Sequence, residues 1–271
     1  MIYYDLAVLF YILSFLLLII NFYFNKTILQ TLQTIFTGLA VVANMAEILL
    51  HWQDMRMLLT YTVHDLLMFV SLSLAVVYLL INLRYKRPYV GFFLLPMVII
   101  AGLASLFLRH GHASSSASLA VENMWLYIHI PLEIIGTAFF LTAFATGLMY
   151  FIMEKQLKQK KFGKIFDRFP SLATIDGLNS GSLFLGFAFY TAGALTAAGW
   201  MRFRIDSAVL DGSFYMKLFF AVLVWAVFAV IIFLKVKSRM NARQTALASI
   251  VGFISIMLVY AAVVLFIMRQ P

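Results

Sequence analysis

The sequence predicts an all-α, polytopic membrane protein with eight transmembrane helices. Of its 271 residues, 64% are hydrophobic and only 11% are charged, and the mean hydropathy is +0.98. A soluble domain carries about 25% charged residues. Apolar runs of about 20 residues recur along the chain, and each can cross the hydrocarbon layer of a bilayer as a helix. The runs are continuous and do not alternate with polar residues, which excludes the strands of a transmembrane barrel.

The predicted spans follow one another from end to end, so we expect residues 1–271 to form a single membrane domain. The first apolar run has no basic segment before it and no small-residue cleavage site. It is therefore predicted to be a span and not a signal peptide. In chain order, the eight spans cover residues 4–24, 31–50, 63–83, 90–108, 124–153, 180–200, 214–234 and 246–268.

Basic residues are distributed unequally between the connections on the two sides. The connections after spans one, three, five and seven contain 14 Lys and Arg, whereas those after spans two, four and six contain 4. Cytoplasmic connections carry such an excess. We therefore place the first set in the cytoplasm and both the N- and the C-terminus outside. This topology explains the net charge of +9, and we expect no nucleic acid as a partner.

Several chemistries are excluded by what the sequence lacks. There is no cysteine, so disulfides and thiolate ligation of haem or zinc are impossible. The motifs of zinc peptidases, serine hydrolases and P-loop nucleotide-binding proteins are absent. A small-solute transporter is a possible alternative function, but it would need a polar inner half that the sequence does not suggest.

All five histidines fall toward the predicted outer side. His110 and His112 lie in a polar loop and are interpreted as solvated. His51 ends the second span, His64 begins the third, and His129 lies near the outer end of the fifth. Ionisable side chains at such depths are costly in lipid and often mark a functional site.

Carboxylates accompany two of these histidines at helical spacing. Glu47 and His51 are four residues apart, as are His129 and Glu133, so each pair shares one helix face. The carboxylate could accept one imidazole N–H and leave the other nitrogen as a metal ligand. Neutral imidazole is a common axial ligand of haem iron. The alternative for each residue is hydrogen bonding between helices.

Tryptophans gather at the same predicted boundary. Trp52, Trp125 and Trp200 all map to the outer side. They are interpreted either as an aromatic belt at the interface or as walls on which a flat tetrapyrrole could stack.

A basic segment at residues 156–171 predicts an interfacial helix. Phe162, Ile165, Phe166 and Phe169 fall on one face of it, and lysines surround them. Such a helix is typical of contact with the surface of an anionic lipid bilayer. Docking to a cytoplasmic partner is the alternative. Ser171 is a candidate cap for a short following turn.

One part of the chain resembles the CcsA/HemX group of cytochrome c assembly membrane proteins. The resemblance is strongest from Trp125 to Asn179, where WLYIH opens a span, EKQLKQKKFG follows it, and PSLATIDGLN comes next. It implies a haem-binding or haem-handling protein of cytochrome c biogenesis in the bacterial cytoplasmic membrane. His129 would be an axial ligand of the iron, and its partner would be another biogenesis membrane protein or a haem-synthesis enzyme.

The sequence also departs from this family. The family's tryptophan-rich outer signature is reduced to Trp200 and Asp211, and no histidine follows His129. His51 or His64 could supply the second axial ligand. We expect haem presentation more than catalysis by this chain alone, with heme as cofactor. In the cofactor site we predict His129, His51, His64, Glu133, Trp125 and Trp200. The alternative is a membrane scaffold or regulator of tetrapyrrole synthesis without bound haem.

Overall fold

The computed structural model describes residues 2–55, 63–85, 88–108, 124–160, 163–204 and 212–267. Within these ranges the chain is helical and contains no β-strand, which confirms the all-α prediction. The elements are α1 (Ile2–Phe24), α2 (Thr27–Met55), α3 (Val63–Tyr85), the short 3-10 helix η1 (Pro88–Val90), α4 (Gly91–Phe107), α6 (Met124–Lys158), α7 (Lys164–Arg168), α8 (Leu172–Arg204), α9 (Gly212–Val236) and α10 (Ala242–Ile267).

Each of the eight predicted spans corresponds to one apolar helix. Seven helices of the described chain are long and apolar enough to cross a membrane, and α4 is a shorter apolar helix of 17 residues. At 1.5 Å per residue, α4 is about 25 Å long, which is at the lower limit for a span. The protein is therefore an integral membrane protein.

The predicted start of the sixth span was eight residues too late. Helix α8 begins at Leu172, because its first two turns are polar and give no hydropathy signal. Ser171, which we expected to cap a short turn, caps this long helix: its Oγ accepts a hydrogen bond from the backbone N–H of Thr174 at 3.3 Å. The cap satisfies one of the backbone donors that a helix N-terminus leaves free.

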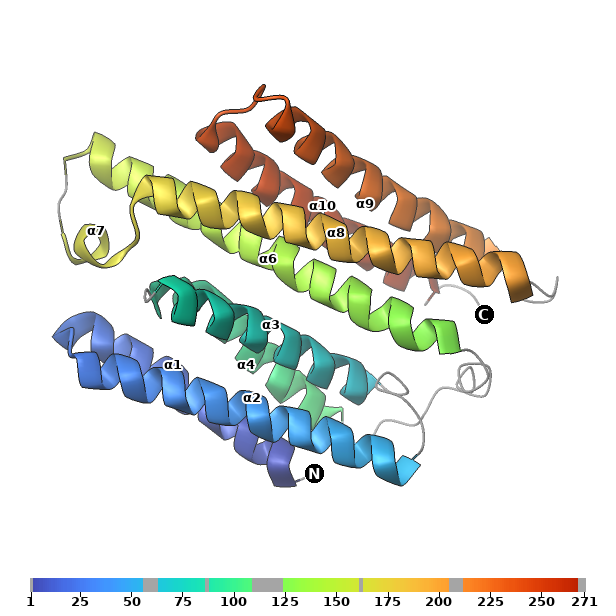
Figure 1. The fold of residues 1–271 in the computed structure, drawn as a ribbon, viewed down its shortest axis with the longest axis horizontal. Coiled ribbons are helices and arrows are strands. Elements are labelled where there is room, and N and C mark those ends of the chain that lie inside the picture. Colours follow the sequence, from blue (N-terminus) through green and yellow to red (C-terminus); the bar gives the residue numbers. More distant parts are fainter. Residues whose placement is uncertain are drawn as a thin grey trace.

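The helices form two groups (Figure 1). Helices α1 to α4 pack together, and α6, α8, α9 and α10 form the second group. Helix α6 joins the groups by packing on α3. The larger hydrophobic core contains side chains of both groups, including Tyr78 of α3 and Met149 of α6, whereas the smaller core, around Phe140 and Phe228, belongs to the second group alone.

The helix ends next to the basic connections lie at one end of the bundle (Figure 1). The start of α1 and the end of α10 lie at the opposite end. With an even number of spans, the charge asymmetry requires the first and last helices to begin and end opposite the basic connections, and the structure has this arrangement. The assignment of the basic end to the cytoplasm remains a prediction.

The basic segment does not form the single interfacial helix that was predicted. Helix α6 continues to Lys158, and a separate helix of five residues, α7, follows. Phe166 and Phe169 pack against the larger hydrophobic core, so at least half of the predicted apolar stripe contacts protein. Phe162 lies outside the described residues.

Candidate functional site

Glycines bring α6 and α8 into close contact. A Cβ atom on Gly136 would lie 2.8 Å from the backbone nitrogen of Tyr190, and one on Gly186 would lie 2.7 Å from the ring of Phe140. One on Gly193 would lie 2.9 Å from Cγ of Glu133. Small residues allow such close approach between membrane helices. The seven-residue spacing of Gly186 and Gly193, which puts both on one face of α8, is the sequence signal for this contact.

The imidazole of His129 is fixed by a backbone carbonyl on the facing helix. Its Nδ1 lies 2.9 Å from the carbonyl oxygen of Gly193, which also accepts a hydrogen bond from Thr196 Oγ1 at 2.6 Å. A carbonyl oxygen can only accept, so Nδ1 carries the proton. The neutral ring therefore presents an unprotonated Nε2, which is the form that binds a metal.

Glu133 occupies a different place from the one that the sequence suggested. We expected its carboxylate to accept the imidazole N–H and orient the ring, but the carbonyl of Gly193 does this. The Oε2 atom of Glu133 lies 3.6 Å from Nε2 instead, on the metal-binding edge. The side chains of His129 and Glu133 are 20% and 24% exposed, so a ligand could reach this edge without the bundle opening.

The two predicted tryptophan walls lie on the same pair of helices. Trp125 is in the first turn of α6, and Trp200 is near the end of α8. Since α6 and α8 are antiparallel and His129 faces Gly193, both positions lie between the histidine and the end of the bundle opposite the basic connections, which is the predicted outer end. Their side chains lie outside the described part of the structure, as do those of Trp52, His110 and His112.

His51 contacts a carboxylate on the neighbouring helix α3, and not the one that we expected on its own helix. Its Nδ1 lies 3.2 Å from Oδ1 of Asp65 on α3. Glu47, the predicted partner, accepts a hydrogen bond from the backbone N–H of Tyr4 at 3.3 Å. Asp65 is buried and the side chain of His51 is 32% exposed, so this contact leaves part of the imidazole accessible.

His64 is a buried residue of the first helix group. Its Nδ1 lies 2.9 Å from the carbonyl oxygen of Ser105, and the Ser105 hydroxyl donates to the backbone carbonyl of His64 at 2.9 Å. Tyr4 packs edge-on against the ring. These contacts join α3 to α4 and leave His64 only 7% exposed, as expected for a histidine that holds helices together.

The structure therefore yields two separate histidine–carboxylate pairs. His129 and Glu133 belong to α6 beside α8, whereas His51 and Asp65 join α2 to α3. No group of three or more His, Asp or Glu able to hold a metal ion forms among the described residues. Each pair can offer one imidazole nitrogen, which suits an axial ligand of haem better than a protein-bound metal centre.

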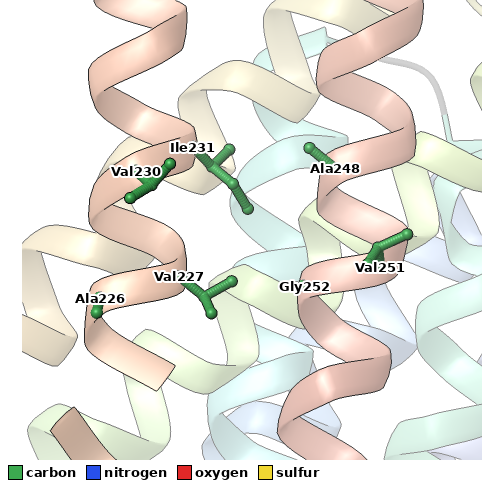
Figure 2. A pocket seen from close by; sticks show the side chains of 7 residues that line it. All are labelled: Ala226, Val227, Val230, Ile231, Ala248, Val251 and Gly252. Carbon is green, nitrogen blue, oxygen red and sulfur yellow. The ribbon is translucent and has the colours of Figure 1, made fainter. Parts of the chain in front are cut away.

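An apolar groove of about 430 Å³ lies apart from these pairs, between α9 and α10 (Figure 2). It is lined by Val227, Val230, Ile231, Val251 and three small residues, with no polar side chain. Val230 and Val251 are more than half exposed on the surface of these two helices. The groove can hold hydrocarbon, but it offers no ligand for iron and no partner for a carboxylate.

Comparison with known proteins identifies similar chains. Residues 60–268 match the family model described as cytochrome C assembly protein. The chain is 22% identical over 236 residues to the cytochrome c biogenesis protein CcsA of Mesostigma viride, covering 79% of this chain and 76% of that protein. It is 27% identical over 144 residues to CcsA of Chlamydomonas reinhardtii (53% and 39%) and 21% identical over 245 residues to CcsA of Heterosigma akashiwo (78% and 75%). The family match includes His64 and His129, and His51 precedes it.

Proposed function

Because this integral membrane protein belongs to the cytochrome c assembly protein family, we propose that it handles haem for cytochrome c assembly and holds the iron at Nε2 of His129. The single observation that carries this proposal is the hydrogen bond from Nδ1 of His129 to the carbonyl of Gly193. Histidines that bind metals almost always donate their other N–H to a carboxylate, a carbonyl or water.

The local geometry suits haem in three respects. The ring orientation is fixed by α8, the ligand edge is partly exposed, and the neutral tautomer has its free nitrogen on that edge. Haem, when bound, would supply an iron to which an imidazole nitrogen can bind. We propose that Trp125 and Trp200 flank the macrocycle, because both lie on α6 and α8 toward the outer end from His129.

Glu133 would act as the alternative partner of the same nitrogen. Its carboxylate lies 3.6 Å from Nε2, close enough for an ion pair with the protonated ring. A metal at Nε2 requires the neutral ring and a displaced Glu133 side chain. Glu133 therefore competes with a metal for this nitrogen, and this competition would ease haem release to a partner.

Between the two candidates for a second ligand, we favour His51 over His64. Nδ1 of His51 lies 3.2 Å from the carboxylate of Asp65 and the side chain is partly exposed, whereas His64 is buried against Ser105 and Tyr4. The two accessible histidines are held on different helix pairs, so His51 could also serve a haem in transit and not the one at His129.

The wider role follows from the same proposal. We propose that the chain presents haem and does not itself catalyse its attachment, and that the recipient is another membrane protein of cytochrome c biogenesis or a haem-synthesis enzyme. We propose the bacterial cytoplasmic membrane as its location. We also propose that residues 1–271 act as one domain, because the larger core contains side chains from both helix groups.

Absorption spectra of the detergent-purified protein, expressed with haem available, test the proposal. We expect a Soret band that is lost in His129→Gly and restored by added imidazole, which can fill the space of the missing ring. His112→Ala is the control, since it removes a histidine from a predicted outer loop and should leave the band unchanged. A wild-type spectrum without a Soret band would favour the scaffold without haem. A band that His129→Gly does not alter would place the iron elsewhere.

A further inference from the structure

The first helix group contains a row of buried polar side chains that runs across the bundle. The row consists of an outer cluster and an inner cluster, both enclosed by α1, α2 and α3. The inner cluster corrects the sequence-based expectation that this half of the protein lacks polar lining. Helix periodicity had not revealed it, because its members come from three different helices.

The outer cluster is centred on Asn44. Its Nδ2 lies 3.1 Å from Oγ of Ser71 and 3.4 Å from the hydroxyl of Tyr11. The hydroxyl of Tyr4 lies 3.4 Å from the same Ser71 oxygen, and the backbone N–H of Tyr4 donates to Glu47. These polar groups therefore form a connected set that reaches the buried carboxylate of Glu47.

The inner cluster is centred on Gln33. Its Nε2 lies 2.8 Å from the hydroxyl of Tyr78 and 3.0 Å from Oγ of Ser14, which lies 2.7 Å from Oγ1 of Thr37. Asn82 extends the cluster by donating to Oε1 of Gln33 at 3.4 Å. All five residues are buried.

The row covers about two thirds of the hydrocarbon thickness of a bilayer. It extends along α2 from Thr34, to which Asn82 donates at 2.9 Å, to Glu47 in the outer cluster. These two positions are 13 residues apart, or about 20 Å at 1.5 Å per residue. The hydrocarbon layer is about 30 Å thick.

Three amide oxygens in this group have no hydrogen-bond partner among the described residues. They are Oδ1 of Asn21, Asn44 and Asn82, and all three side chains are at least 97% buried. An unpaired buried acceptor costs about 1–3 kcal/mol. Lipid cannot supply the missing donors. Water inside the bundle can, and the neighbouring hydroxyls and amides provide the further partners that a buried water needs.

Buried apolar side chains, among them those of Ala40 and Ala75, separate the two clusters. Ala40 lies between Thr37 and Asn44 on α2, and Ala75 lies between Ser71 and Tyr78 on α3. Both alanines are fully buried, and their side chains are the smallest after glycine. The unpaired oxygen of Asn44 is one helical turn from Ala40, next to these apolar side chains.

We propose that α1, α2 and α3 enclose a file of water molecules that connects the two clusters and conducts protons across the membrane. In each step a hydronium ion gives one proton to the next water, so one O–H bond breaks, one forms, and only charge is displaced. Hydroxyls of Ser14, Thr37 and Ser71 orient the waters. This path is independent of haem at His129.

The absence of cysteine allows a direct test, because one introduced thiol is then the only one in the chain. Ser71→Cys and Ser14→Cys probe the outer and inner clusters with almost no change of volume. Val42→Cys on α2, two residues from the Asn44 that contacts Ser71, and Leu16→Cys on α1, two residues from Ser14, are the controls, with side chains exposed on the outside of the bundle. The probe is a small cationic methanethiosulfonate, which reacts with the thiolate that forms only in contact with water.

We expect both serine positions to react at least tenfold faster than their controls in membrane vesicles. Equal rates for cluster and control positions would overturn the water file. Proton conduction is tested separately in liposomes that contain a pH-sensitive dye and the wild-type protein or Asn44→Leu. We expect a proton leak that falls at least fivefold in Asn44→Leu. A wild-type leak equal to that of protein-free liposomes would overturn proton conduction.

Discussion

Replacement of Gly193 by alanine tests both the packing of the bundle and the site. The new Cβ atom would lie 2.9 Å from Cγ of Glu133, 3.3 Å from its backbone nitrogen and 3.4 Å from the carbonyl oxygen of His129. The Glu133 side chain can rotate away, but the backbone of α6 can yield only if the two helices separate. The same movement would draw the Gly193 carbonyl away from Nδ1 of His129.

The expected cost follows from three contributions. Overpacking of a tight contact costs about 1–3 kcal/mol. Loss of the hydrogen bond to His129 adds about 1 kcal/mol. The better helix propensity of alanine offsets up to about 1 kcal/mol. We therefore expect Gly193→Ala to destabilise the protein by about 2 kcal/mol and, if His129 binds haem, to weaken haem binding by about tenfold.

Gly177→Ala provides the matched control on the same helix. A Cβ atom on Gly177 would meet nothing within 4 Å, so only the propensity contribution remains and the variant should be as stable as wild type or slightly more stable. Unfolding in mixed detergent micelles with increasing dodecyl sulfate measures both variants. Equal stability of Gly193→Ala and Gly177→Ala would refute the close α6–α8 contact. A destabilised Gly193→Ala protein with unchanged haem content would refute its link to His129.

Three further predictions concern the same helices. Gly136→Ala should lower the stability of the protein more than Gly193→Ala, because its Cβ would meet backbone atoms at 2.8 and 3.0 Å that cannot rotate away. A smaller loss for Gly136→Ala in the detergent unfolding assay would disprove this. Asn179→Leu should cost about 1–2 kcal/mol, because Asn179 hydrogen-bonds to both α6 and α10, and a loss below about 0.3 kcal/mol in the same assay would contradict the network. Ser171→Ala should cost about 1 kcal/mol, since it removes the cap of α8, and Ser171→Asp should retain the stability measured for wild type.

The apolar runs were sufficient to predict the helices but not all of their ends. Span boundaries follow from where polar residues begin, and this criterion misplaced the start of α8, whose first turns are helical but polar. The cap at Ser171 was predictable, because capping depends on residues close in sequence. The separate helix α7 was not, because Phe166 and Phe169 pack against a core assembled from distant segments.

The candidate site was predicted in part for a similar reason. His129 and Glu133 share a face because of spacing within one helix, which sequence alone determines. The carbonyl that fixes the imidazole comes from Gly193, 64 residues later, and a backbone carbonyl has no sequence signature. The partner of His51 proved to be Asp65 on the next helix, which depends on how α2 and α3 rotate against each other.

The sequence by itself determined that this chain is a membrane protein, which apolar segments form helices, and which helix ends share the basic connections, because hydropathy and charge act locally along the chain. Only the tertiary structure decided which tautomer His129 adopts, which histidines are accessible, and that buried amides and hydroxyls of α1 to α3 form one row. Those properties depend on contacts between helices, where glycines set the distance and packing sets the rotation of each helix.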